Sequence, residues 1–211
     1  LLEYVPFIIL LLALFTISGG VRLTGALVGT PIVNLAIILI GTFLASWMGT
    51  TGAAMLLIRP LINANKHRKN IVHIIVFFIF LVANIGGSLT PLGDPPLFLG
   101  FLKGVDFFWT TTAMFVPMLI MIIALSINFY FLDSYYLKKE DIKVEAPQEK
   151  LKLGIEGVFN LGLIVGVIGA VLISGFWKPH ISFEVYSGVH LELQNLTRDI
   201  LPVSYTHLRA H

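Results

Sequence analysis

Long apolar runs separated by short polar interruptions make up most of this chain. The apolar runs cover residues 4–18, 31–48, 53–58, 71–84, 97–102, 107–136 and 154–177. A helix that crosses the hydrocarbon core of a bilayer needs about 20 such residues, and several of these runs approach or exceed that length. The pattern therefore predicts an all-α, polytopic membrane protein.

One apolar run is interrupted at its centre by small and hydroxylated residues. Gly49-Thr50-Thr51-Gly52 separates the run that starts at Pro31 from a second arm that ends at Arg59-Pro60. At about 1.5 Å per residue this second arm is too short to cross the membrane. We expect a re-entrant hairpin over residues 31–63 whose tip stops near the middle of the membrane.

A second interruption is rich in glycine and proline. The apolar run from Ile71 breaks at Gly86-Gly87-Ser88-Leu89-Thr90-Pro91-Leu92-Gly93-Asp94-Pro95-Pro96 and returns at Leu97. Two half-helices flanking this break predict one discontinuous transmembrane helix over residues 71–103. Because the tip and the break both place Gly and Thr in apolar sequence, we expect them to lie side by side.

The remaining chain completes the predicted domain, residues 1–200. It contains a helix over residues 107–137, a loop over residues 138–153 and a helix over residues 154–177, followed by an amphipathic segment to Ile200. Residues 201–211 resemble a translated sequencing adapter, so we expect a non-native tail there.

Composition and charge narrow the function. Only 12% of the 211 residues are charged and the net charge is +2, which gives no basis for a nucleic-acid partner. The chain has no cysteine, which excludes disulfides and thiol catalysis. It also has no nucleophile triad, His-Glu-x-x-His motif or P-loop, so we do not expect an enzyme. Lys and Arg concentrate at residues 59–70 and 138–152, and the positive-inside rule places both loops in the cytoplasm.

Non-helical backbone inside a bilayer survives only where protein or a water-filled cavity surrounds it, so the tip and the break are the candidate binding site. The carbonyl ends of the helices near Met48 and Asn84 suit a cation. Neutral oxygens that suit Na⁺ come from Thr50, Thr51, Asn84, Ser88 and Thr90. Gly86 and Gly87 either serve the site or allow close packing.

Asp94 is the one carboxylate within the break. A charge at the centre of a spanning helix costs about 2.5–3.5 kcal/mol on insertion scales, which favours a role as a proton carrier or a Na⁺ ligand. The alternative is a helix N-cap, because Pro95 follows it. Outside the break we expect His73 at the interface, Asn65 in a loop, and Asp133 within reach of water near a helix end.

The sequence Ala83-Asn84-Ile85-Gly86-Gly87 through Gly93-Asp94-Pro95-Pro96 resembles the ion transporter superfamily, which contains sodium/proton antiporters, citrate and dicarboxylate carriers and arsenite permeases. Gly49-Thr50-Thr51-Gly52-Ala53 and Ile58-Arg59-Pro60 resemble its hairpin tip and exit. The nearest resemblance is to bacterial sodium/proton antiporters.

This resemblance implies half of an inverted-repeat transporter in the bacterial inner membrane, with Na⁺ exchanged for H⁺ by alternating access and no cofactor. Na⁺ and H⁺ are then the transported ions. The implied partners are the lipid bilayer, a C-terminal half of the same chain, small ions and a second copy in a homodimer.

Two departures from the family pattern bear on the substrate. Many relatives have Asn where this chain has Leu97, which argues against a ligand at position 97. Dicarboxylate carriers have Ser-Asn-Thr where this chain has Gly49-Thr50-Thr51, which argues against a carboxylate substrate. No Lys or Arg lies at either interruption, although the helix N-termini near Ala53 and Pro95 suit an oxyanion. The alternatives to antiport are an organic-anion (citrate or dicarboxylate) or arsenite permease, and a membrane scaffold that transports nothing.

Overall fold

The computed structural model describes residues 4–25, 27–140, 154–177, 181–186 and 189–209, and helices dominate this part of the chain. The elements are α1 (Tyr4–Ser18), β1 (Arg22–Thr24), α2 (Pro31–Met48), α3 (Thr50–Ala64), α4 (Val72–Leu81), the 3₁₀ helix η1 (Ile85–Leu89), α5 (Pro95–Leu102), α6 (Trp109–Lys139), β2 (Gly154–Glu156), α7 (Val158–Phe176), β3 (Ser182–Tyr186), β4 (Val189–Glu192) and α8 (Leu193–His207).

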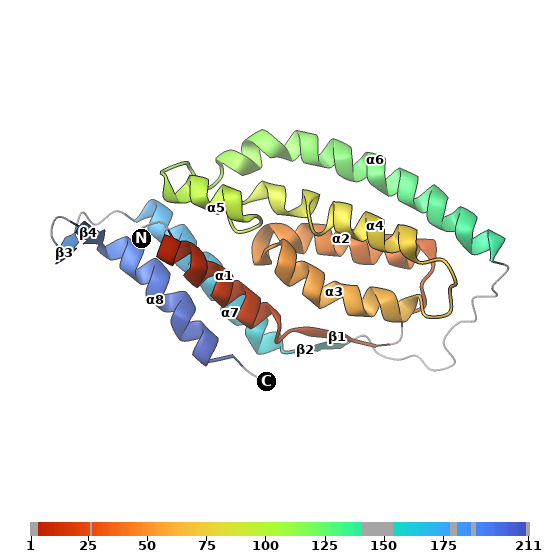
Figure 1. The fold of residues 1–211 in the computed structure, drawn as a ribbon, viewed down its shortest axis with the longest axis horizontal. Coiled ribbons are helices and arrows are strands. Elements are labelled where there is room, and N and C mark those ends of the chain that lie inside the picture. Colours follow the sequence, from red (N-terminus) through yellow and green to blue (C-terminus); the bar gives the residue numbers. More distant parts are fainter. Residues whose placement is uncertain (1–3, 26, 141–153, 178–180, 187–188, 210–211) are drawn as a thin grey trace.

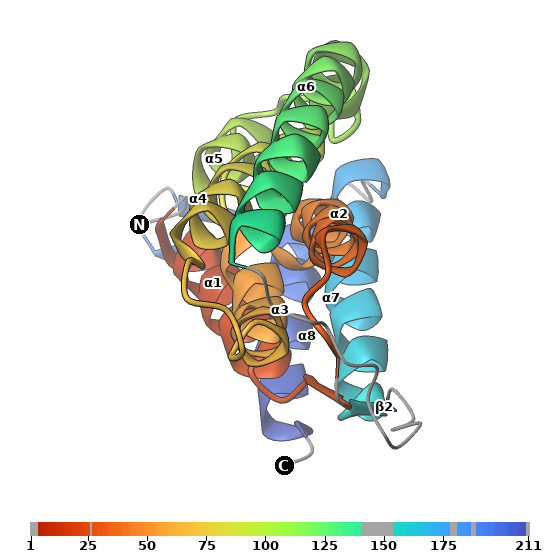
Figure 2. The same ribbon diagram turned by 90° about the vertical axis from the view of Figure 1, so that its right-hand side faces the viewer.

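The helices form two groups. In the first, α2 packs against α3, α4, η1 and α6, and the long α6 lies along the outside (Figure 1). In the second, α1, α7 and α8 pack against one another, and α1 also contacts α3 and α5. Figure 2 shows α7 and α8 on the side of the molecule away from α6. The candidate site lies where α1 meets the first group.

Four stretches in the described residues are long and apolar enough to cross a membrane: Pro31–Met48, Val72–Leu89, Trp109–Lys139 and Val158–Phe176. The helix α1 is apolar but shorter. These stretches confirm the expectation of a helical, multi-pass membrane protein. Two further expectations stay predictions: that the α2–α3 hairpin re-enters the membrane, and that the chain is half of an inverted repeat.

The α2–α3 hairpin has local signals at both of its ends. The Thr30 hydroxyl accepts a hydrogen bond from the Val33 N–H at 3.3 Å, and Pro31 occupies the first turn of α2, where its missing N–H costs nothing. At the tip, Gly49 has φ +82°, a conformation that strains residues with a Cβ. The chain therefore reverses at a single residue between α2 and α3.

The break between α4 and α5 lies against this tip. The Ser46 hydroxyl donates to the Gly86 carbonyl at 2.5 Å, and the Thr50 N–H donates to the Gly93 carbonyl at 3.1 Å. The Leu89 carbonyl accepts from the Thr111 hydroxyl of α6 at 2.6 Å. The structure thus confirms that the tip and the break are neighbours, and it shows how protein groups satisfy the interrupted backbone.

Short strands are the elements that the sequence did not predict. β1 pairs antiparallel with β2, with Thr24 opposite Gly154, and β3 pairs antiparallel with β4. The amphipathic segment 178–200 contains β3, β4 and the start of α8 among its described residues. Three-residue strands are missed because their partners lie far away in the sequence.

The other predicted segments fall partly outside the described residues. Most of the loop 138–153 does so, since α6 continues to Lys139 and the description resumes at Gly154. Residues 201–207 belong to α8, where Tyr205 packs against Gly166 of α7. That residues 201–211 are a non-native tail stays a prediction.

Glycine is required where the tip and the break meet. A Cβ on Gly93 would lie 2.1 Å from the Gly87 carbonyl oxygen, and a Cβ on Gly87 would lie 2.7 Å from the Thr50 methyl group and 2.8 Å from the Gly93 carbonyl oxygen. Real Cβ atoms do not approach other atoms this closely. Any side chain at Gly93 must therefore push the two segments apart.

We predict that Gly93→Ala lowers the free energy of unfolding by about 1–3 kcal/mol, the usual cost of overpacking. Gly162→Ala on α7 is the matched control, because its new Cβ would meet no atom within 4 Å, and in a helix Ala is favoured over Gly by about 1 kcal/mol. Thermal unfolding of the detergent-solubilised protein measures both. Equal melting temperatures for the two variants would contradict the close contact.

Candidate functional site

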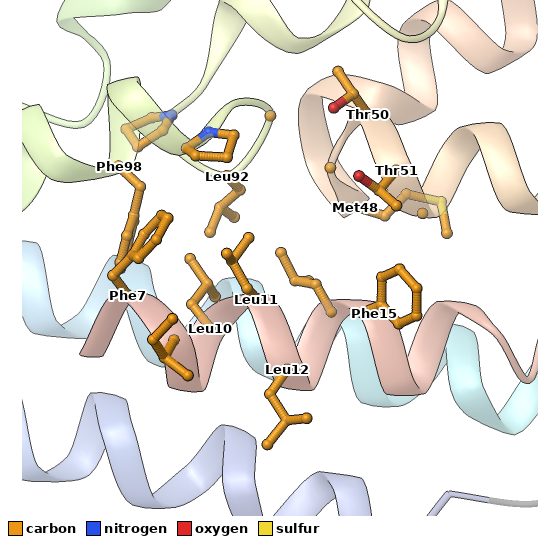
Figure 3. A pocket seen from close by; sticks show the side chains of 17 residues that line it. Phe7, Leu10, Leu11, Leu12, Phe15, Met48, Thr50, Thr51, Leu92 and Phe98 are labelled. Atoms are coloured by element: carbon orange, nitrogen blue, oxygen red, sulfur yellow. The ribbon is translucent and has the colours of Figure 1, made fainter. Parts of the chain in front are cut away.

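A pocket of about 460 Å³ lies between α1 and the junction of the tip and the break (Figure 3). Its walls are mostly apolar. The α1 wall includes Phe7, Leu10, Leu11 and Phe15, and the opposite wall includes Met48, Leu92 and Phe98. Its polar edge comes from residues 49–52, where Figure 3 shows the Thr50 and Thr51 hydroxyl groups on the side of the tip.

The tip presents hydrogen-bond donors without partners. The first N–H groups of a helix have no intrahelical acceptor, and no side chain caps the N-terminus of α3. The Thr50 N–H is used by Gly93, which leaves the N–H groups of Thr51 and Gly52 as the next donors. Within the described chain the hydroxyls of Thr50 and Thr51 also have no hydrogen-bond partner. Uncapped N–H groups with two hydroxyls suit an oxyanion.

Ser18, at the C-terminal end of α1, adds a hydroxyl that no local sequence pattern singles out. It is 1% exposed, and its Oγ has no hydrogen-bond partner among the described residues. A Cβ on Gly52 would lie 2.6 Å from this Oγ, so the hydroxyl lies directly against the tip. Buried hydroxyls nearly always have a partner, so this one is an unusual feature of the packing behind the tip, although Ser18 itself does not line the pocket.

Asp94 occupies the N-cap position of α5 but does not cap it with its side chain. The Leu97 and Phe98 N–H groups donate to the Asp94 backbone carbonyl, at 3.0 and 3.3 Å. Within the described residues the half-buried carboxylate forms no hydrogen bond or ion pair. The Asp94 carboxylate is thus available for a cation or a proton.

The other predicted ligands are partly used by the fold. The Thr90 hydroxyl donates to the Ser46 carbonyl and accepts from the Leu92 N–H, and the Ser88 hydroxyl donates to the Ile85 carbonyl at 2.9 Å. The Asn84 amide is exposed and turns back to the Ile79 carbonyl at 2.8 Å. A carbonyl at the end of α4 that was expected to face a cation is therefore already occupied.

Gly86 and Gly87 both serve close packing. A Cβ on Gly86 would lie 2.7 Å from the Thr42 carbonyl oxygen of α2, and Gly87 faces Thr50 as described above. Of the predicted site residues, Thr50 and Thr51 line the pocket, whereas Asn84, Ser88, Thr90 and Asp94 do not. A Na⁺ site built from Thr50, Thr51, Asn84, Ser88, Thr90 and Asp94 stays a prediction.

One expectation outside the break is wrong, that for Asp133, whereas Asn65 lies in the turn after α3 as expected. Asp133 is 0% exposed and does not reach water. His73 is buried against it, with 2.7 Å between Nε2 of His73 and Oδ1 of Asp133. Asn65 is 1% exposed and caps the end of α3. All three lie near helix ends, where polar residues usually reach solvent, and no local signal distinguishes the buried case.

The fold and the site together define a class of protein. Apolar spanning helices, an uncapped helix tip and a satisfied helix break around a pocket are the arrangement of a membrane transport protein. The family described as "Putative citrate transport" matches residues 1–210. The chain therefore belongs to this family, and with it to the ion transporter superfamily. No curated protein and no solved structure matches the chain.

We predict that Ser18→Ala stabilises the ligand-free protein by about 1 kcal/mol or more, because burying an unsatisfied hydroxyl costs about 1–3 kcal/mol. Ser174→Ala is the control, since the Ser174 hydroxyl is also buried but donates to the Val171 carbonyl at 2.7 Å. The two melting temperatures should move apart, with only that of Ser18→Ala rising. A fall for Ser18→Ala would mean that its hydroxyl has a partner in the unliganded protein.

Proposed function

We propose that this chain forms part of a secondary transporter that carries a carboxylate of the citrate class together with a cation. The observation that carries the proposal is the uncapped N-terminus of α3, whose residues Thr50, Thr51 and Gly52 line the pocket. Family membership supports citrate transport. It lends no support to the sodium/proton specificity predicted from the sequence, so the citrate alternative becomes the principal hypothesis.

The anion end of the site is the α3 tip. A helix N-terminus carries about half a positive charge, and its free N–H groups bind carboxylates directly. In this chain Thr51 and Gly52 line the pocket there, and the orphaned Ser18 hydroxyl lies behind Gly52. The α5 N-terminus contributes little, because Pro95 and Pro96 have no N–H to donate.

The cation end is Asp94. Neither residues 49–52 nor residues 85–96 contain Lys or Arg, so a bare carboxylate near Asp94 would meet an uncompensated negative charge. A bound cation removes that repulsion, and carboxylate and hydroxyl oxygens suit a hard cation such as Na⁺. This requirement couples the anion to the cation, and protonation of Asp94 would substitute for the metal ion.

Alternating access needs two groups of helices that move against each other. The pocket lies between α1 of one group and the tip and break of the other, which supports movement along this boundary. We further propose that a second, inverted half completes the carrier in the bacterial inner membrane, and that residues 59–70 and 138–152 face the cytoplasm.

Asp94→Asn in the full-length carrier tests the cation end. Asn preserves shape and N-cap preference but carries no charge, so we expect cation-driven citrate uptake into liposomes to fall at least about tenfold, a loss of about 1.4 kcal/mol. Asp106→Asn, at an exposed loop aspartate whose carboxylate accepts from the Phe108 N–H, should transport normally. Normal uptake by a well-folded Asp94→Asn would refute the cation role.

Residues 1–200 alone should not transport. A half-carrier lacks the inverted partner that completes the site and against which it moves. Liposomes that contain only this segment should show neither citrate uptake nor proton exchange above that of empty liposomes. Cation-dependent uptake by the segment would show that no second half is required.

A further inference from the structure

Five buried polar side chains gather at the end of the α2–α3 hairpin that is farthest from the tip. They come from α2, from the end of α3, from the α3–α4 loop, from the start of α4 and from the end of α6, and they are Asn34, Asn65, Arg68, His73 and Asp133. None is more than 9% exposed. We call this set the polar clamp.

Asp133 is the centre of the polar clamp. Its Oδ1 lies 2.6 Å from Nη1 of Arg68 and 2.7 Å from Nε2 of His73. Its Oδ2 accepts a hydrogen bond from the Asn34 amide at 3.0 Å. One carboxylate of α6 therefore binds side chains from α2, the α3–α4 loop and α4.

The two asparagines join the hairpin arms to each other. The Asn34 amide donates to Oδ1 of Asn65 at 3.0 Å, and the Asn65 amide donates to Oδ1 of Asn34 at 2.7 Å. Arg68 extends the network, because its Nη2 donates to the backbone carbonyl of Asp133 at 3.2 Å. The His73 ring stacks on Tyr136 with 4.7 Å between centroids.

A second contact holds the same loop to α6 at its exposed side. The N–H groups of Lys69 and Asn70 donate to the Glu140 carboxylate, at 3.3 and 2.7 Å. Partial burial raises the pKa of Glu140, but the hydrogen bonds from Asn70 and Lys69 outweigh it and hold the pKa below its usual range. Glu140 is therefore charged at neutral pH and keeps this contact.

Stability alone does not account for the polar clamp. The desolvation of two charges offsets much of their attraction, and well-packed apolar residues often replace a buried ion pair without loss. Such a network does fix one arrangement of the elements that it joins, because any other arrangement leaves a buried charge unpaired. The elements joined here are the arms that carry the tip and the break at their other ends.

We propose that the polar clamp is a positioning device that sets the α2–α3 hairpin and the α4–η1–α5 helix in the register at which Thr50 meets Gly93. Asn34 and Asn65 lie about 20 Å from the tip along their helices, at 1.5 Å per residue, and rigid helices transmit the alignment. Arg68, His73 and Asp133 thus act on the site without touching it. The citrate-uptake measurement in the test rests on the proposed function, whereas the measurement of the alignment between tip and break does not.

The chain contains no cysteine, so paired cysteines report the alignment directly. Thr50→Cys with Leu92→Cys places one thiol on the tip and one on the break, at side chains that line the same pocket. Thr24→Cys with Gly154→Cys is the matched control pair, because these residues face each other across β1 and β2, outside the hairpin and the broken helix. The rate of disulfide formation under mild oxidation is measured in membranes for each pair.

Five variants of the polar clamp are compared in each cysteine background. The single variants Asp133→Asn and Arg68→Met each leave a buried charge without its partner. The double variant, Arg68→Met with Asp133→Leu, removes both charges and replaces them with apolar side chains. His73→Gln retains an N–H that can donate to Asp133, whereas His73→Leu does not. Citrate uptake by the full-length carrier is measured for each folded variant, without the cysteines.

We expect the double variant to fold, with a lowered melting temperature because Asn34 and His73 lose their acceptor on Asp133. We expect its tip–break disulfide to form at least about fivefold more slowly, the lower end of typical coupling between distant sites. The β1–β2 pair should react at an unchanged rate. His73→Leu should slow the tip–break pair and His73→Gln should restore it. The apparent KM for citrate should rise in step with the loss of cross-linking.

Wild-type tip–break cross-linking in the folded double variant would overturn the positioning role and leave the polar clamp with a purely structural one. Equal slowing of both cysteine pairs would also overturn it, because the change would then be global. Slower cross-linking without any citrate uptake by the unmodified carrier would uphold the positioning role and refute the proposed substrate. The two failures are therefore distinguishable.

Discussion

The fold depends on one constraint: polar backbone groups inside an apolar environment must find partners in the protein. An interrupted helix exposes such groups, and here two interruptions satisfy each other. Ser46 and Thr50 of the hairpin serve the carbonyls of Gly86 and Gly93, and Thr111 of α6 serves Leu89. The small size of Gly87 and Gly93 makes this contact sterically possible. At the candidate site, some polar groups of the two interruptions are left without a hydrogen-bond partner.

These unpaired groups give the site its chemistry. The α3 N-terminus is uncapped, the Ser18 hydroxyl is buried without a partner, and the Asp94 carboxylate forms no bond within the described chain. The donors of α3 lie at the pocket and the Asp94 carboxylate lies beside it, between the lining residues Gly93 and Pro95, which matches an anion that travels with a cation. The polar clamp, about 20 Å away along the helices, is by contrast densely hydrogen-bonded. One end of the hairpin is fixed while the other keeps groups free for a ligand.

The parts of this arrangement that follow from local chemistry could be predicted from the sequence. Pro31 and Gly49 bound α2 because proline starts helices and glycine adopts positive φ, and the glycines and prolines from Gly86 to Pro96 mark the break. The juxtaposition of tip and break followed from their shared composition. Ser18 could not be selected, because a serine at the end of an apolar helix carries no signal until Gly52 packs on it.

The polar clamp was beyond prediction for a similar reason. Asp133 lies 60 residues from His73 and 99 from Asn34 along the chain, and each lies near a helix end, where water is the usual partner. Only the packing of α6 over α4 and α2 removes that water. The short strands β1 and β2 were missed because pairing between segments so far apart leaves no local pattern.

The most direct test of the central claim is whether citrate and a cation occupy the pocket together. Phe15→Cys places a thiol on the α1 wall of the pocket without altering a proposed ligand, and residues 1–211 contain no other cysteine. Its alkylation rate in the full-length carrier should fall when citrate and Na⁺ are added together and change little with either alone. Unchanged alkylation in the presence of both, by a carrier that transports citrate, would contradict this account of the site.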